Sequence, residues 1–410
     1  MKVLIVSSSD IQGGAARAAY RLHRALLDNG VDSNMLVQNK SSDDFTVIRK
    51  GGKIAKYLNK LMPIFDKLPL RFYPKRSKDL FSPSWIKFGD IVKQIDRINP
   101  DIVHLHWVCG GMMRIEDFAR ITQPIIWSLH DMWAFTGGCH YSGNCQGFLS
   151  GCGNCVFLNS GKERDLSRKV FSRKRKAFSQ KDNMAIVGVS DWISHCSENS
   201  YLLKGKKHVC LPNLINTSMF KPCEAVFSRK LWNLPQGRKL ILYGAIGATS
   251  DPRKGFKELG SAIRKLKSTN VELVVFGSGL PEHAPNFEFK VHYLGSLSDI
   301  ASLVTLYSAV DVMVVPSKQE AFGQTASEAM ACGTPVVAFR TTGLLDIVNH
   351  KENGYLAKSF DVDDLAFGID WVLNHEDSNK ISRNARDKVL STFDSNLVAR
   401  KYINLYQEMR

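Results

Sequence analysis

Short hydrophobic runs alternate with segments of helical spacing along the whole chain. Such runs are typical of strands that are buried on both faces of a parallel sheet. The pattern therefore predicts the α/β class, with one sheet in each half of the chain. The predicted strands are residues 2–8, 33–38, 101–107, 124–131 and 184–190, then 239–247, 271–279, 291–297, 310–317 and 334–339.

The helices and breaks between these strands predict the domain organisation. A helix over 15–30 follows Gly13 and Gly14, and later helices are predicted at 255–268, 300–309 and 323–332. A chain of 410 residues is long enough for two such domains. We expect a doubly wound domain over 1–195, with a cysteine-rich insertion at about 137–158, and a second domain over 196–390. The stretch around Pro212 resembles a linker, and a last helix within 391–410 is expected to pack back on the first domain.

Residues 53–65 have a different pattern. Apolar residues recur at positions 54, 57, 58, 61, 62 and 65, while Lys53, Lys56 and Lys60 fall on the opposite side. A basic amphipathic helix of this kind suits an anionic membrane interface. The alternative is a helix that packs on the core with a solvated basic face.

Charge indicates which partners to expect. The formal net charge is +16, and residues 1–200 carry 29 Lys and Arg against 18 Asp and Glu. A basic first half predicts an anionic partner, which could be a membrane surface, a phosphorylated substrate or nucleic acid. Neither a run of eighteen apolar residues nor a secretory signal is recognisable, so we expect a cytoplasmic protein.

Four cysteines form a cluster in the first half: Cys139, Cys145, Cys152 and Cys155. In a reducing compartment such a cluster is more typical of a metal site than of disulfides. Four thiolates, or three with His140, would close one tetrahedral zinc site of the structural kind. An iron–sulfur cluster and a loop of unligated cysteines are the alternatives.

The most specific signal is SKQEAFGQTASEAMACGTPVVAF at 317–339. Glu320 ends a loop after a strand, Gly323 precedes a helix, and Glu328 lies on that helix. A glycine at a helix start exposes backbone N–H groups to an anion, which the helix dipole also favours. Carboxylates accept strong hydrogen bonds from hydroxyls. The segment is therefore suited to a ligand that carries both phosphate and hydroxyl groups.

This segment resembles the donor motif of the family 4 retaining glycosyltransferases, whose GT-B fold has two Rossmann-like domains facing across a cleft. The Gly-Gly loop after the first strand, PDIVHLHW, PRKGF and VVFGSG occur in the order expected for that family. LHDMW, TGGCHY and the cysteines that follow are similar to the branch that makes colanic acid and related polysaccharides.

The resemblance implies a role for each matching residue. Lys254, with Arg253, would neutralise the departing diphosphate, although Ala248 stands where many relatives have an arginine. Glu320 would hold the sugar hydroxyls, Glu328 would hold the ribose, and His130 would lie near the reacting sugar. The implied catalytic residues are His130, Lys254 and Glu320; the donor-binding residues are Gly14, Arg253, Lys254, Gly277, Glu320, Ala321, Phe322, Gly323 and Glu328; the acceptor-side residues are Gly13, Gly14 and Asp131.

The implied reaction moves a sugar, with retention, from a UDP- or GDP-sugar to a hydroxyl of a lipid-linked or growing bacterial surface polysaccharide. Catalysis would need no metal, because the acidic run at 361–364 has the composition of a helix cap. We expect a location at the inner face of the cytoplasmic membrane and no nucleic-acid partner. The alternatives are a sugar-nucleotide epimerase or hydrolase of the same fold and a zinc-knot nucleic-acid-binding protein.

Overall fold

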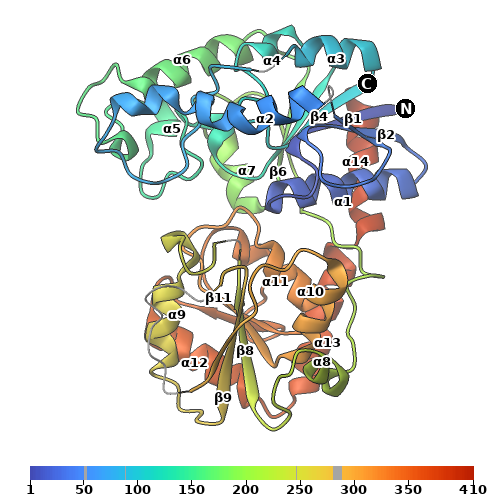
Figure 1. The fold of residues 1–410 in the computed structure, drawn as a ribbon, viewed down its shortest axis with the longest axis vertical. Coiled ribbons are helices and arrows are strands. Elements are labelled where there is room, and N and C mark those ends of the chain that lie inside the picture. Colours follow the sequence, from blue (N-terminus) through green and yellow to red (C-terminus); the bar gives the residue numbers. More distant parts are fainter. Residues whose placement is uncertain (50–52, 88, 246, 280–288) are drawn as a thin grey trace. The chain divides into compact units, whose positions relative to one another are not determined.

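The chain folds into two compact units. The computed structural model describes residues 1–410 except 50–52, 88, 246 and 280–288. The side chains of residues 53–57 also lie outside the description. The first unit is Met1–Pro212 with Ala399–Arg410, and the second is Asn213–Val398 (Figure 1). The boundary thus lies at the predicted linker and not at residue 195, because one further strand after that residue joins the first sheet.

The first unit holds a parallel sheet of seven strands in the order β3-β2-β1-β4-β5-β6-β7. Its strands are β1 (Lys2–Ser9), β2 (Asp32–Asn39), β3 (Val47–Arg49), β4 (Ile102–Leu105), β5 (Ile125–Leu129), β6 (Met184–Gly188) and β7 (Lys207–Cys210). Its helices are α1 (Gly14–Asp28), α2 (Lys53–Asp66), α3 (Ile91–Ile98), α4 (Asp117–Arg120), α5 (Gly147–Ser150), α6 (Leu166–Phe178) and α7 (Asp191–Glu198), with short 3-10 turns η1 (Leu68–Phe72), η2 (Trp133–Phe135) and η3 (Val156–Leu158).

The second unit repeats this plan with six parallel strands in the order β10-β9-β8-β11-β12-β13. Its strands are β8 (Lys239–Gly244), β9 (Val271–Phe276), β10 (Val291–Tyr293), β11 (Val312–Val315), β12 (Val336–Phe339) and β13 (Gly354–Ala357). Its helices are α8 (Ala225–Leu231), α9 (Phe256–Ile263), α10 (Ile300–Ala309), α11 (Gln324–Ala331), α12 (Val362–Leu373) and α13 (Ser378–Thr392), with turns η4 (Pro252–Lys254) and η5 (Thr342–Asp346).

Every predicted strand is present, but β3, β7 and β13 were not predicted. β3 and β7 are edge strands, and β7 is only partly buried, so neither produces a clear hydrophobic run. The acidic run at 361–364 is a helix cap, as predicted, because the Asp361 carboxylate accepts the backbone N–H groups of Asp363 and Asp364. Within the described residues, no helix is both long and apolar enough to cross a bilayer.

Strand order locates the ligand-binding edge of each sheet. The order reverses between β1 and β4 in the first unit and between β8 and β11 in the second. In open parallel sheets, ligands bind beyond the carboxyl ends of the strands at such a switch point. The loops after β8 and β11 are therefore the place to look for a donor site in the second unit.

The last helix, α14 (Ser395–Met409), adds buried tyrosines to the first unit. The Tyr406 hydroxyl lies 2.8 Å from His104 Nδ1, and the Tyr402 hydroxyl lies 3.1 Å from Ser128 Oγ. These contacts join the C-terminal residues to β4 and β5.

Candidate active site

Lys254 and Glu320 meet at the switch point of the second sheet. Lys254 ends η4 in the loop after β8, and Glu320 lies in the loop after β11. The Lys254 ammonium is 2.5 Å from Glu320 Oε1, and the two side chains are only 16% and 12% exposed. Two residues that are 66 positions apart in sequence thus form one charged pair at the edge where the topology predicts a ligand.

Neighbouring groups hold this pair in place. The Ser317 hydroxyl donates to the Glu320 carboxylate at 2.9 Å, and the Glu320 N–H donates to the Thr342 hydroxyl at 3.0 Å. Gly255 follows Lys254 with φ +76°, and a Cβ there would lie 1.9 Å from the Pro316 carbonyl oxygen. The Lys254 loop can therefore approach the Glu320 loop this closely only with glycine at 255.

The electrostatics keep Glu320 ionised. Burial raises the pKa of its carboxyl, but the charges of Lys254 and Arg253 and two hydrogen bonds lower it more, so the pKa lies below its ordinary value. Arg253 is itself engaged, because its guanidinium donates to the Gln319 carbonyl and to the Asp251 carboxylate, both at 2.9 Å. Arg253 thus links the two loops, while Lys254 contacts the carboxylate directly.

The rest of the predicted donor segment is largely buried. Ala321 and Phe322 lie in the core, and the Phe322 ring packs edge-on against Phe393. Gly323 has φ +107° and precedes α11, as the motif predicts. Glu328 is 3% exposed and accepts the Tyr307 hydroxyl at 2.8 Å, so its carboxylate already has a protein partner. Ribose binding by Glu328 stays a prediction.

The predicted glycines occupy strand ends and a helix start. Gly277 follows β9 with φ +85°, and a Cβ there would lie 2.0 Å from the Ala245 carbonyl oxygen, so packing alone requires glycine. Gly13 precedes α1 with φ +99°, and no atom lies within 4 Å of the position a Cβ would take. Gly14 is the first residue of α1. The helix start after β1 thus lies at the switch point of the first sheet.

His130, at the end of β5, forms a pair with His106. His130 Nε2 lies 2.8 Å from His106 Nδ1, and the rings are stacked with centroids 5.1 Å apart. Burial lowers the pKa of His130 to about 4 despite the nearby Asp131 charge, so the ring is neutral at pH 7. Among the described residues, His106 Nε2 is buried without a hydrogen-bond partner. His106 was not among the residues singled out from the sequence, so this contact was missed.

Asp131 contacts a different set of residues. It lies 2.7 Å from His140 Nδ1 and accepts the Trp107 indole N–H at 2.9 Å and the Trp133 backbone N–H at 2.8 Å. These hydrogen bonds hold the Asp131 carboxylate against Trp107, Trp133 and His140. Because His140 Nε2 also contacts the Ser82 hydroxyl at 2.8 Å, both ring nitrogens are engaged and His140 does not suit a metal-ligand role.

The four clustered cysteines are free thiols in one loop region. Burial raises the pKa of Cys139 to about 12 and that of Cys152 to about 11. Zinc–sulfur bonds of about 2.3 Å would require closely grouped sulfur atoms. In the part of the chain that the structure describes, no three of these sulfurs lie within 4.8 Å of one another. As placed, the thiols do not fit a closed zinc site, and metal binding stays a prediction that elemental analysis can test.

Two doubly wound units of this kind define the GT-B fold, and family profiles agree. The family described as "Glycosyl transferases group 1" matches residues 227–388, and the one described as "Glycosyltransferase Family 4" matches residues 12–218. The second match alone covers just over half of the chain. The chain belongs to the family 4 glycosyltransferases.

Similar proteins come from several organisms. The putative colanic acid biosynthesis glycosyl transferase WcaC of Escherichia coli is 22% identical over 364 residues, which is 85% of each chain. An uncharacterized glycosyltransferase of Methanocaldococcus jannaschii is 32% identical over 193 residues, which is 45% of this chain and 48% of that protein. This chain therefore spans about half the length of the second relative.

Solved structures share the fold. Sucrose-phosphate synthase of Thermosynechococcus elongatus superposes with a TM-score of 0.72 at 19% identity, covering 100% of this chain and 99% of that one. Anabaena HepE in complex with UDP and glucose has a TM-score of 0.62 at 16% identity and covers all of both chains. At identities this low, the structural likeness shows the GT-B fold of the chain and nothing further.

Proposed function

We propose that the protein is a retaining glycosyltransferase that moves a sugar from a UDP- or GDP-sugar to a hydroxyl of a lipid-linked or growing bacterial surface polysaccharide. The observation that carries the proposal is the partly buried Lys254–Glu320 pair at the switch point of the second sheet. Solved relatives include HepE with UDP-glucose and WaaG, which is involved in lipopolysaccharide biosynthesis. Matched relatives include the N,N'-diacetylbacillosaminyl-diphospho-undecaprenol alpha-1,3-N-acetylgalactosaminyltransferase of Campylobacter jejuni and CapM, a capsular polysaccharide biosynthesis glycosyltransferase of Staphylococcus aureus.

In this proposal Lys254 serves the leaving group. An ammonium group carries three N–H donors, so one can bond Glu320 while two remain for phosphate oxygens. As the sugar–phosphate bond breaks, negative charge builds on the diphosphate, and a cation already held in place stabilises that charge without reorganising. Arg253 lies in the same loop and is paired with Asp251, so the proposal gives the leaving-group role to Lys254 and assigns no divalent cation to the reaction.

Glu320 and the leaving phosphate handle the sugar. The Glu320 carboxylate, kept ionised by its neighbours, accepts sugar hydroxyls and favours the positive charge of the oxocarbenium-like state. The acceptor hydroxyl attacks from the face the nucleotide leaves, and the departing phosphate takes its proton. His130 is neutral at pH 7. Its Nε2 is held by His106 Nδ1, so in this proposal Nδ1 is the ring nitrogen left for a sugar hydroxyl.

Donor binding and transfer test the proposal together. We expect a UDP- or GDP-sugar to raise the melting temperature of the protein, and Lys254→Ala and Glu320→Ala to lose both this shift and transfer to lipid extracts. Lys239→Ala is the control. Lys239 is the first residue of β8, so it lies at the amino ends of the strands and not at the carboxyl ends where the donor loops lie, and its side chain is 47% exposed. A Glu320→Ala protein that transfers sugar at the wild-type rate would refute the site assignment.

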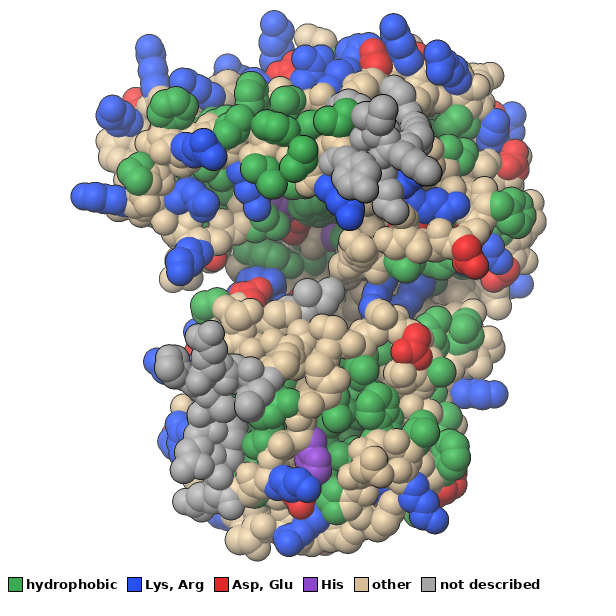
Figure 2. All heavy atoms as spheres, in the orientation of Figure 1, with side chains coloured by type: hydrophobic (Ala, Val, Ile, Leu, Met, Phe, Trp, Pro, Cys, Tyr) green, Lys and Arg blue, Asp and Glu red, His purple; other side chains and the backbone are tan. Residues whose placement is uncertain are grey.

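The acceptor proposal includes an anionic membrane surface. Asn59 holds α2 on the first unit, because its side chain donates to the Gln38 carbonyl at 2.8 Å. Beyond it, Ile64 is 58% exposed and Phe72 is 86% exposed, next to the basic residues Lys67 and Arg71. Figure 2 shows hydrophobic and basic side chains interspersed on the face that carries α2. Apolar side chains among cations favour insertion between anionic headgroups. The predicted basic residues Lys53 and Lys56 lie outside the described side chains.

Vesicle sedimentation tests this part. We expect binding to vesicles that contain phosphatidylglycerol and little binding to pure phosphatidylcholine. Phe72→Ser should reduce binding several-fold, whereas Phe45→Ser should not, although Phe45 is 91% exposed on the same unit. Equal binding by both variants would remove Phe72 from the membrane contact.

The other functions have less support. A GT-B epimerase or hydrolase would share the donor site, but no finding favours it over transfer. A nucleic-acid-binding function would leave the Lys254–Glu320 pair unexplained. Consumption of a nucleotide-sugar in the absence of any acceptor would revive the first alternative.

A further inference from the structure

The second unit carries a cavity whose lining includes neither Lys254 nor Glu320. Its volume is ≈690 Å³, within the range typical of small-ligand pockets. It lies along α12, between this helix, the segment after α9 and the turn that follows α12. Lys267, in that segment, precedes the amino end of β9, whereas the donor loops follow the carboxyl ends of β8 and β11. None of the residues that line the cavity belongs to the loops that carry Lys254 and Glu320, so the cavity and the donor loops are separate.

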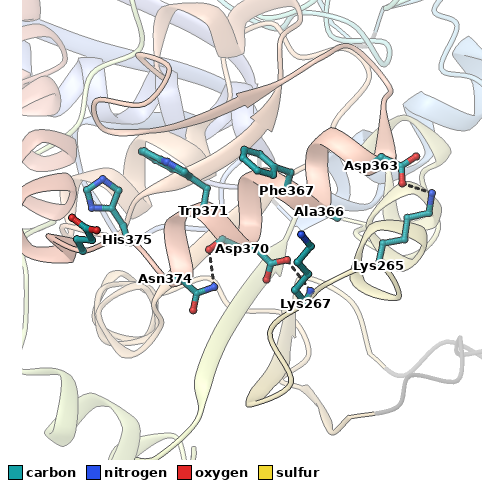
Figure 3. Close-up of a pocket in the computed structure, with 10 residues that line it drawn as sticks. Lys265, Lys267, Asp363, Ala366, Phe367, Asp370, Trp371, Asn374 and His375 are labelled. Atoms are coloured by element: carbon teal, nitrogen blue, oxygen red, sulfur yellow. Dashed lines mark hydrogen bonds and ion pairs between the residues drawn. The ribbon is translucent and has the colours of Figure 1, made fainter.

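Two aromatic side chains of α12 border the cavity. Phe367 and Trp371 are four positions apart, so they lie on one face of the helix, as Figure 3 shows. The opposite face, with Leu365 and Ile369, is buried in the core. Phe367 is 54% exposed even though its ring contacts Tyr355. The core thus does not account for the outward phenylalanine.

Polar groups beside the aromatic rings are already ordered. The Asp370 carboxylate accepts the backbone N–H groups of Lys267 at 2.8 Å and Ser268 at 3.1 Å. The Asn374 amide donates to the Ser268 hydroxyl at 2.9 Å, and His375 Nδ1 accepts the Asp377 N–H at 3.1 Å. A ligand that meets this surface meets fixed carboxylate, amide and imidazole groups, so binding would cost little side-chain entropy.

The charge of the cavity differs from that of the rest of the protein. Its lining holds two lysines and three carboxylates, and Lys265 is paired with Asp363 at 2.5 Å. The chain as a whole carries a net charge of +16. A lining without excess positive charge does not suit phosphates, anionic lipids or nucleic acid. A neutral ligand rich in hydroxyl groups fits it better.

We infer that this cavity binds a neutral saccharide segment, as a holding site for the glycan chain separate from the donor loops. The C–H faces of a sugar ring pack against aromatic faces, whose surface is electronegative, and the hydroxyls bond to amide and carboxylate groups. The inference rests on the proposed function, in which a growing polysaccharide is the acceptor. A site away from the reaction centre would keep that chain on the enzyme between transfers.

A glycan array and titration calorimetry test the inference. The probe is an array of neutral bacterial polysaccharides and their oligosaccharides, followed by calorimetry with the best-bound member. Phe367→Ala should weaken binding by about tenfold. Phe227→Ala is the matched control, because Phe227 is 59% exposed on α8 of the same unit and should leave binding unchanged. The melting-temperature shift with donor should be the same in both variants, which also shows that both are folded.

The outcomes separate this inference from the proposed function. Glu320→Ala should lose transfer and still bind the array glycan. If the wild-type protein transfers sugar but binds no neutral glycan, or binds it equally well with Phe367→Ala, the inference is wrong. If light scattering shows that Phe367→Ala changes the oligomeric state, the face is an interface between copies and the inference is also wrong. Glycan binding that depends on Phe367 without any transfer would instead refute the proposed function alone.

Discussion

Removing the carboxylate of Glu320 should destabilise the second unit even without substrate. In Glu320→Ala the Lys254 ammonium stays in a largely buried position, because its side chain is only 16% exposed, and it loses its partner at 2.5 Å. Breaking a buried pair in this way costs about 3–5 kcal/mol, because one charge remains without compensation. Partial contact with water places this pair at the lower end, so we expect about 3 kcal/mol.

Calorimetry can measure this loss as a fall in the melting temperature. For a unit of this size, about 3 kcal/mol corresponds to a fall in melting temperature of roughly 6–12 °C. The matched comparison is Lys318→Ala, which removes an ion pair with Glu258 at 2.7 Å whose lysine is 42% exposed. Exposed pairs contribute about 0–1 kcal/mol, so this variant should melt close to the wild type. If Glu320→Ala costs no more than Lys318→Ala, the pair is not closed in solution.

The sign of the pH dependence provides a second check on the same pair. The folded pKa of Glu320 lies below its ordinary value, so the unfolded chain takes up the proton first as the pH falls. The stability from the pair should be complete above the unfolded pKa of about 4.3 and should be lost as the pH falls through the folded value. Glu320→Ala should therefore show a smaller loss of stability in acid than the wild-type protein.

Three further predictions concern other parts of the chain. Gly255→Ala should destabilise the second unit by more than about 2 kcal/mol in urea unfolding, because the added Cβ would lie 1.9 Å from the Pro316 carbonyl oxygen. Gly237→Ala is the control and should cost less, because no atom lies within 4 Å of a Cβ there. Equal effects of the two substitutions would contradict the packing argument. Burial lowers the pKa of His23 to about 4, so the unfolded chain is protonated before the folded protein as the pH falls, and about 3 kcal/mol of stability should be lost between pH 6.5 and 4. His23→Gln should lose this part of the pH dependence. If the slope of unfolding free energy against pH is unchanged in that variant, other groups cause it. Transfer should persist in EDTA, because cationic side chains take the role of a metal in the proposal; complete loss that Mg²⁺ or Mn²⁺ restores would contradict that.

The sequence predicted best what depends on local pattern. Buried strands have distinct hydrophobic runs, so the positions of β8 and β11 could be predicted, and with them the loops that carry Lys254 and Glu320. Asp361 was predicted as a helix cap because that role depends only on its neighbours in sequence. The weaker edge strands β3 and β7 lack a hydrophobic run and were missed.

Contacts between distant segments could not be predicted. Nothing in the sequence relates His106 to His130 beyond their places on neighbouring strands, and nothing links Asp131 to His140 and Trp107. The Glu328 motif could be recognised, but its hydrogen bond with Tyr307 depends on how α10 packs against α11. The sequence also showed no sign of the cavity along α12. Phe367 and Trp371 fit an ordinary amphipathic helix, and only the structure shows that Phe367 is exposed.

The place of the last helix affects when the protein can fold during synthesis. Tyr402 and Tyr406 contact Ser128 and His104 in the core of the first unit, yet the ribosome makes them after the whole second unit. At about 5–20 residues per second, the emerging first unit waits roughly 10–40 s for these side chains. During that interval the polar groups of His104 and Ser128 lack their tyrosine partners. The second unit is continuous in sequence and can fold first. N-terminal fragments that end near Pro212 lack Tyr402 and Tyr406 altogether, so they should depend more on chaperones than the full chain does.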